Sequence, residues 1–74
     1  MATEDIRIRL GKRIRELRRA RGWRQIDLAA HAELSKTHIC ELETGKREVG
    51  LKALERIAGA LDTSVSKLMS DIGR

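Results

Sequence analysis

Apolar residues along the chain recur at spacings of three and four, which is the periodicity of one face of an α-helix. The first such stripe runs through four positions, namely Ile6, Leu10, Ile14 and Leu17. Comparable stripes further along predict five helices, at about residues 4–21, 25–32, 36–44, 51–61 and 65–71. Thr3 is a suitable N-cap for the first helix, and Glu4 and Asp5 would lie in its first turn, where the helix dipole favours anions.

The second and third predicted helices are separated by a very short turn. Ser35 is a good N-cap for the third helix, and Gly45 is its natural C-terminal stop. The stretch around Glu33 leaves room only for a tight corner between the two helices. Ile39 and Leu42 are the apolar residues that the third helix would bury. Two short helices joined in this way form a helix-turn-helix arrangement.

Composition supports a small helical domain with an anionic partner. A chain of 74 residues suffices for one small domain, and we expect a single domain over residues 1–74. Phe, Tyr and Pro are absent, which favours helices over a sheet. The net charge is +5, with 16 basic and 11 acidic residues, and it suggests a polyanion or an acidic surface as partner. The alternative is a helical domain that is merely basic.

The sequence predicts a cytoplasmic protein that is not an enzyme. A single cysteine cannot form an internal disulfide, which favours a reducing compartment. No apolar run is long enough for a secretory segment or a membrane span, so we expect no membrane association. The chain shows no paired base and nucleophile and no phosphate-cradling glycine loop. We therefore expect no catalysis, no cofactor and no small-molecule ligand.

The outward side of the third predicted helix has the chemistry of a DNA-reading surface. Five residues lie on it: Lys36, Thr37, Cys40, Glu41 and Thr44. Lys36 and Thr37 occupy the first turn, at the positive end of the helix dipole, which suits entry into a major groove. Gln25 begins the second helix, where free backbone N–H groups point outward. Periodicity alone fits an ordinary solvated face equally well, but the helix pair and the basic charge favour DNA.

Three segments of the chain are recognisable: "RQIDLA", "LSKTHICELETGKR" and "ALERIAGALDTSVSKL". Together they resemble the helix-turn-helix domain of the phage-repressor and Cro type, the xenobiotic-response-element family. The likeness covers Ile14 to Met69 and, with the first helix, nearly the whole chain. It implies a compact, five-helix, lambda-repressor-like domain that binds operator DNA as a symmetric homodimer. Small proteins of this design include restriction–modification controller proteins, antitoxins and phage repressors, which act in the cytoplasm at the bacterial nucleoid.

By position, the resemblance implies roles for individual residues. Lys36 would reach guanine O6 and N7, Thr37 a thymine methyl group or a base acceptor, and Glu41 the amino group of cytosine. Phosphate contacts are implied for seven residues: Arg24, Gln25, Ser35, His38, Thr44, Lys46 and Arg47. The last helix carries more apolar surface than a monomer needs. The family often dimerises there, which places a homodimer interface at three positions: Leu61, Met69 and Ile72.

The family also pairs a basic residue late in the first helix with a glutamate near the end of the third, here Arg18 and Glu43. Such a bidentate pair would lock the two helices together. Three positions depart from the family pattern. Glu33 replaces the usual corner glycine, and Arg24 replaces a capping hydroxyl or amide; each change would cost about 1 kcal/mol. Glu41 would repel phosphates unless it meets a cytosine amino group or a neighbouring cation.

Other residues allow alternative interpretations. His31, His38 and Cys40 could be metal ligands, but they diverge on their helices without a fourth ligand, and we expect no metal site. A redox-active thiol at Cys40 stays open beside an inert surface residue. Trp23 is expected to fill the core rather than to stack on a base. The rival function is a small protein-interaction module, an antitoxin or adaptor whose basic face meets an acidic protein; an RNA-binding module would need more aromatic residues.

Overall fold

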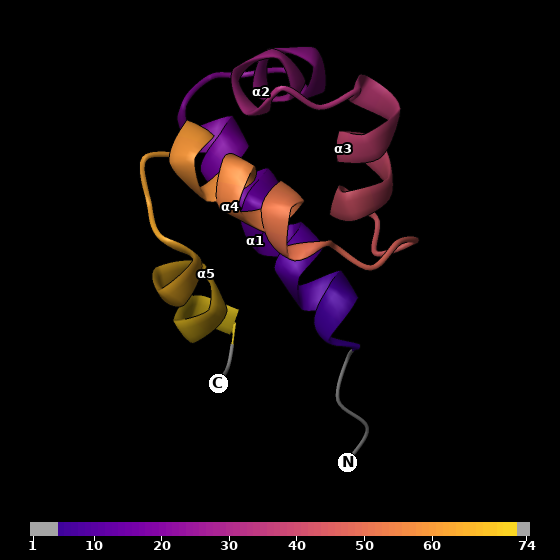
Figure 1. The fold of residues 1–74 in the computed structure, drawn as a ribbon, viewed down its shortest axis with the longest axis vertical. Coiled ribbons are helices and arrows are strands. Elements are labelled where there is room, and N and C mark those ends of the chain that lie inside the picture. Colours follow the sequence, from indigo (N-terminus) through magenta and orange to yellow (C-terminus); the bar gives the residue numbers. More distant parts are fainter. Residues whose placement is uncertain (1–4, 73–74) are drawn as a thin grey trace.

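The structure is a computed structural model that describes residues 5–72, and in this range it is built from helices alone. The elements are α1 (Ile6–Ala20), α2 (Gln25–Ala32), α3 (Lys36–Glu43), α4 (Leu51–Ala60) and α5 (Val65–Ile72) (Figure 1). The prediction of a five-helix, all-α fold is therefore confirmed. The helix ends lie within two residues of the predicted ones, and α2 has the predicted bounds. No helix among the described residues is long and apolar enough to cross a membrane.

Helix α1 starts later than predicted, because Asp5 is its N-cap. The Asp5 carboxylate accepts the backbone N–H of Arg7 at 2.8 Å and pairs with the Arg7 guanidinium at 3.0 Å. The side-chain bond from Arg7 and then the backbone bond lower the pKa of Asp5 to about 2. The placement of Asp5 in the first turn was wrong, whereas the proposed cap Thr3 and its neighbour Glu4 lie outside the described residues.

The core is one apolar cluster to which every helix contributes. Helix α1 packs against α3 and α5, and α2 packs against α3 and α4. The side chains of Ile14, Leu28, Ile39, Ile57 and Leu68 are almost completely buried. Each fully buried side chain of this size stabilises the fold by about 1.5–3 kcal/mol. The buried residues of α3 leave its opposite face uncovered.

The core also contains two residues that were expected at a dimer interface. Leu61 and Ile72 are only 5% and 6% exposed, so the chain buries them by itself, and this part of the prediction was wrong. Helix α5 is held against α1, where Arg9 donates to the Ile72 carbonyl at 2.7 Å. Met69 is half-buried. The most exposed large apolar side chain of the described residues is instead Leu51, at 83%.

Helices α1 and α3 touch through their backbones at Gly11. A Cβ atom at this position would collide with the Leu42 carbonyl and would lie 2.6 Å from the carbonyl oxygen of Glu43. Only glycine permits this approach, which brings the end of α3 directly onto α1. Gly11 was not among the residues predicted to matter from the sequence.

The corner between α2 and α3 has the predicted tight form. Glu33 adopts left-handed angles, φ 57° and ψ 43°, and its N–H caps the end of α2. The side chain of Ser35 then accepts the backbone N–H of His38 at 3.0 Å and starts α3. Helix α3 ends before Gly45, which has a φ of 73°. These residues fix the direction of α3 and therefore of its exposed face.

Candidate nucleic-acid interface

The exposed face of α3 consists of the residues that the periodicity indicated. Ile39 and Leu42 point into the core, at 0% and 3% exposure. On the other side, a shallow hollow of about 180 Å³ is lined by four residues: Lys36, Thr37, Cys40 and Glu41. Thr44 is exposed one turn further on. The described part of the chain therefore leaves this face open to an incoming molecule.

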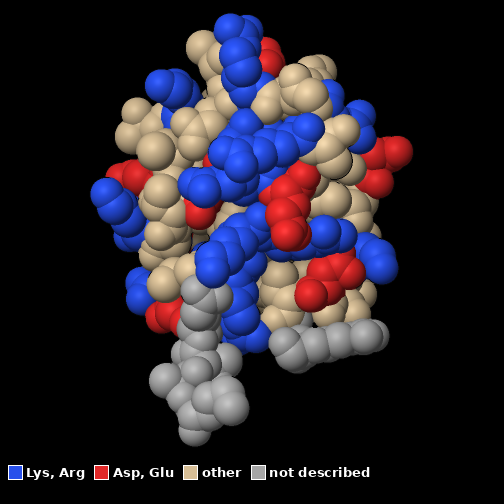
Figure 2. Space-filling view, turned by 180° about the vertical axis from the view of Figure 1, so that it is seen from behind, with Lys and Arg blue, Asp and Glu red and all other residues tan. Residues whose placement is uncertain are grey.

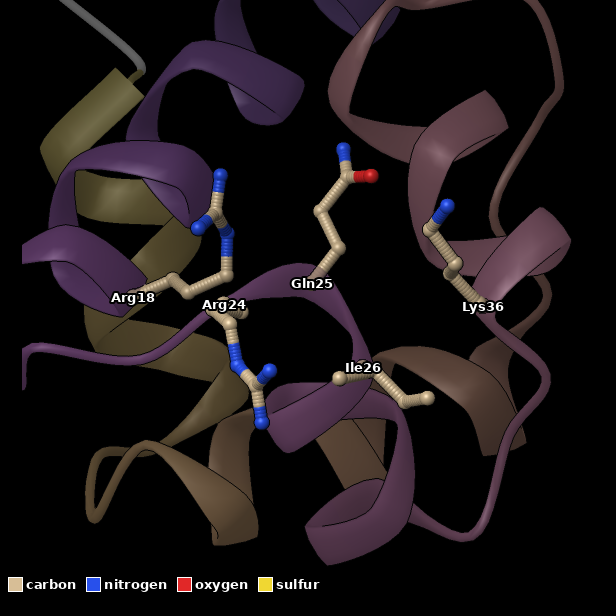
Figure 3. A pocket seen from close by; sticks show the side chains of 5 residues that line it. All are labelled: Arg18, Arg24, Gln25, Ile26 and Lys36. Carbon is tan, nitrogen blue, oxygen red and sulfur yellow. The ribbon is translucent and has the colours of Figure 1, made fainter.

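A second, larger hollow of about 490 Å³ lies where α1, α2 and α3 meet. Its lining is Arg18, Arg24, Gln25, Ile26 and Lys36 (Figure 3). Figure 3 shows Gln25 between Arg18 and Lys36, with these three side chains pointing to one side and Arg24 pointing the other way. Arg18 and Arg24 are each paired with a carboxylate, so Lys36 and the Gln25 amide are the groups of this hollow that attract an anion beside the N-terminal end of α2. Lys36 borders both hollows, so it connects the face of α3 to this cationic site.

A buried ion pair forms the floor of the cationic site. Arg18 donates Nε to Glu43 Oε2 at 2.6 Å and Nη2 to Oε1 at 3.0 Å, which confirms the predicted bidentate pair. Burial tends to raise the pKa of Glu43, but the hydrogen bonds from Arg18 and Gln25 outweigh burial and lower it. Arg18 also donates to the Trp23 carbonyl at 2.8 Å. The pair therefore joins α1, the start of α2 and α3.

Gln25 is held by this pair in a position that suits a phosphate. Its amide nitrogen donates to Glu43 Oε1 at 3.2 Å. An amide nitrogen carries two N–H groups, so this bond leaves one for another acceptor. The predicted contact of Gln25 with a phosphate is compatible with this geometry and stays a prediction.

Asp27 partly replaces the missing N-cap side chain at Arg24, a role that was not predicted from the sequence. The Asp27 carboxylate accepts the backbone N–H of Arg24 at 2.7 Å and pairs with its guanidinium at 3.2 Å. The hydrogen bonds from the side chain and then the backbone of Arg24 lower the pKa of Asp27. Arginine has no acceptor for the free N–H groups of α2, so Asp27 supplies only half of a capping box. The signal available in the sequence was the three-residue spacing between Arg24 and Asp27, which is the spacing of a capping box.

The other residues predicted to contact phosphates lie around α3, and they differ in exposure and in the hydrogen bonds that they already make. The Ser35 oxygen accepts a backbone N–H, and its own proton can still be donated. The Thr44 hydroxyl donates to the Cys40 carbonyl at 2.9 Å, so it must rotate before it can donate to a phosphate. His38 is half-buried, whereas Lys46 is exposed beyond the end of the helix.

Arg47 lies back over α3 and pairs with Glu41. Its Nη2 atom is 3.1 Å from Glu41 Oε1. This is the neighbouring cation that an acid on a DNA-facing helix requires. The structure therefore brings together two residues to which the sequence had assigned separate contacts, Glu41 to a base and Arg47 to a phosphate.

Trp23 packs against the apolar core, as predicted. Its ring stacks on His31 with centroids 4.3 Å apart, and the Arg21 guanidinium lies 4.6 Å from the ring centroid. These neighbours take the ring area that a stacked base would need. Within residues 5–72, no group of three His, Cys, Asp or Glu side chains is arranged to hold a metal ion.

Basic side chains also gather on the far side of the molecule. Figure 2 shows Lys and Arg over the middle of the face turned away from the viewer in Figure 1, where α1 lies. Helix α1 has the arginine-rich sequence IRIRLGKRIRELRRA. Such a concentration of positive charge raises the local concentration of a polyanion around the whole domain.

Comparison with known proteins gives consistent relatives. The family model described as "Helix-turn-helix domain" matches residues 9–68. The chain is 39% identical over 69 residues to Control protein C.MunI of Mycoplasma sp, covering 92% of this chain and 93% of that protein. It is 34% identical over 62 residues to the Immunity repressor protein of Bacillus phage phi105, covering 84% of this chain and 43% of the repressor.

The fold has solved counterparts among the same kinds of protein. The restriction-modification controller protein C.AhdI from Aeromonas hydrophila superposes with a TM-score of 0.81 at 35% identity, covering 84% of this chain and 94% of that structure. The helix-turn-helix geometry, the open face of α3 and these matches agree with one another. The chain therefore belongs to the helix-turn-helix domain family of DNA-binding transcription regulators.

Proposed function

We propose that the chain binds double-stranded operator DNA sequence-specifically, as a homodimer, with α3 in the major groove. The observation that carries this proposal is the position of Lys36. It borders both the open face of α3 and the cationic site around Gln25. A helix that enters a major groove needs base-reading groups on one flank and phosphate-binding groups beside them.

In this proposal the face of α3 reads bases, and the cationic site and its neighbours bind phosphates. Lys36 and Thr37 contact base edges, and each good contact contributes about 1–3 kcal/mol of discrimination. Gln25, Arg24 and Lys46 contact phosphates, which fixes the orientation of the domain and makes affinity depend on salt. The remaining candidates at the ends of α3 support this orientation: Ser35, His38 and Thr44.

Lys36 and Lys46 variants test this division. Duplexes selected from a random pool are titrated by fluorescence anisotropy at two salt concentrations. We expect Lys46→Ala to weaken binding to all duplexes alike, because one phosphate contact is lost. The slope of log affinity against log salt concentration should then fall by about 1. We expect Lys36→Ala to lower the affinity for the selected duplex by roughly 5- to 150-fold and to change the preferred base.

The matched control is Lys67→Ala on α5, where Lys67 pairs with Asp71 at 3.4 Å. We expect its affinity to stay within about twofold of the unchanged chain. Binding that is absent or insensitive to salt would contradict the proposal. It would favour a protein-interaction module whose basic face meets an acidic protein.

The homodimer is proposed to use a groove other than the expected one. A hollow of about 240 Å³ is lined chiefly by apolar side chains: Ile6, Leu10, Val49, Leu51, Leu54 and Met69. Arg7 and Glu48 also line it with opposite charges. A two-fold axis would place the exposed Leu51 of each chain in the groove of the other and Arg7 opposite the partner's glutamate. The recognition helices would then read half-sites about 34 Å apart.

Leu51→Glu tests this interface by sedimentation equilibrium. We expect the unchanged chain to sediment as a dimer at tens of micromolar and the variant as a monomer, because the apolar groove would remove water from the new carboxylate. Arg7 also lines the groove, but it is already paired with Asp5 at 3.0 Å. Ser66→Glu adds the same charge at an exposed position of α5 and should leave the dimer intact. A monomeric unchanged chain, or a dimeric Leu51→Glu variant, would count against this groove.

A further inference from the structure

We propose that Glu41 is a positioning residue for Arg47, and that Arg47, not Glu41, reads a base pair. The inference rests on the proposed function and names the specificity-determining pair within it. Its starting observation is the ion pair of 3.1 Å between Arg47 Nη2 and Glu41 Oε1. Glu41 lines the hollow on the open face of α3 together with Thr37 and Cys40.

The backbone that carries Arg47 is held firmly against the rest of the domain. The N–H of Lys46 donates to the Glu41 carbonyl at 3.0 Å, and that of Gly45 donates to Leu42 at 3.3 Å. A Cβ atom at Gly45 would lie 2.7 Å from the Ile8 side chain, so this turn touches α1 closely. The turn after α3 therefore has a fixed course, and the ion pair brings the Arg47 side chain back to Glu41 in the last turn of α3.

The chemistry of the pair favours Arg47 as the residue that meets the base. A guanidinium has five N–H donors, so one contact with a carboxylate leaves a donor edge for guanine O6 and N7. Glu41 has the weaker position for reading a base, because its Oε1 atom is buried and lies 3.1 Å from Arg47 Nη2, so the charge of the carboxylate is already balanced. The two side chains are 49% and 36% exposed, so both are accessible to DNA.

The pair also affects binding to DNA of unrelated sequence. Non-specific affinity comes almost entirely from cations that neutralise phosphates. Glu41 cancels the charge of Arg47 and ties its guanidinium to the base-facing side. Removing the carboxylate therefore has two opposite effects: it loosens the base contact and releases a cation for phosphates.

The test compares Glu41→Gln, Arg47→Ala and the double variant on the selected duplex, on its single-base-pair changes and on random duplex. We expect Glu41→Gln to lower the affinity for the selected duplex about fivefold to tenfold and to raise the affinity for random duplex about twofold to fourfold. Both single variants should relax the preference at the same base pair. The double variant should bind within about twofold of Arg47→Ala, because Glu41 acts only through Arg47.

Further measurements separate the possible outcomes. Arg47→Lys keeps the charge but lacks the two-pronged guanidinium, so we expect it not to restore the base preference. Thermal unfolding of Glu41→Gln should match the unchanged chain, which excludes a merely structural role. Altered preference at different base pairs, or effects that multiply in the double variant, would overturn the inference while leaving the proposed function intact. Failure of the unchanged chain to bind duplex in a salt-dependent way would overturn both.

Discussion

Replacing Arg18 with methionine is expected to lower the free energy of unfolding by about 3–5 kcal/mol at neutral pH. The Glu43 side chain is 0% exposed, and the variant leaves its charge buried without its bidentate partner. Domains of this kind have total stabilities of about 5–15 kcal/mol, so the loss is a large fraction of the whole. Urea denaturation followed by far-ultraviolet circular dichroism measures it.

Two variants control for this result. Arg19→Met changes the neighbouring residue, which is exposed, and should change stability by less than about 0.5 kcal/mol. Replacing both Arg18 and Glu43 with methionine removes both charges, and we expect this double variant to be more stable than Arg18→Met alone. A loss of under about 1 kcal/mol in Arg18→Met would show that the pair does not lock α1 to α3.

The same pair predicts opposite pH dependences. In the unchanged chain the pKa of Glu43 lies below its ordinary value of 4.5. Its contribution to stability is therefore complete above the unfolded pKa and is lost as the pH falls through the folded one. In Arg18→Met only Gln25 and Arg15, whose Nε lies 3.5 Å from Glu43 Oε1, still lower the pKa of Glu43. We expect burial to outweigh these two groups and to raise that pKa above its ordinary value. The deficit of the variant should then shrink as the pH is lowered towards 4.5.

Local patterns predicted the helices because each signal lies within a few residues of the element it controls. Ser35 caps the helix that follows it, and Gly45 stops the helix that precedes it. The periodic stripes identified the buried sides, but a stripe does not tell which surface covers it. Leu61 and Ile72 were therefore assigned to a second chain, although their own chain buries them.

Such local patterns could not predict contacts between segments that are distant in the sequence. A glycine inside a helix costs about 1 kcal/mol relative to alanine, so Gly11 was a sign of close approach that could have been noticed. Its partners in α3 could not be named from the sequence. Glu41 and Arg47 are six positions apart across a turn, and no helical spacing rule brings them together. By contrast, the Arg18–Glu43 pair was foreseen, because the resemblance to the phage-repressor family implied it.

Alkylation of Cys40 is expected to weaken specific DNA binding strongly. It is the only cysteine of the chain, and its thiol is exposed on the face of α3 beside Lys36 and Thr37. A maleimide group there would hold α3 out of the groove and remove at least two base contacts. At about 1–3 kcal/mol for each contact, we expect affinity for the selected duplex to fall by roughly 100-fold. Cys40→Ser should bind normally and should be unaffected by the reagent.

The central claim is that the open face of α3 enters the DNA groove, and protection of Cys40 tests it most directly. The rate of N-ethylmaleimide addition is followed by mass spectrometry with and without the selected duplex. A control chain carries Cys40→Ser and Ser66→Cys, which moves the thiol to the exposed side of α5. At about ten times the dissociation constant, the duplex should slow the reaction of Cys40 roughly tenfold and leave the thiol at position 66 unaffected. Unchanged reactivity of Cys40 on a duplex-saturated protein would contradict the account.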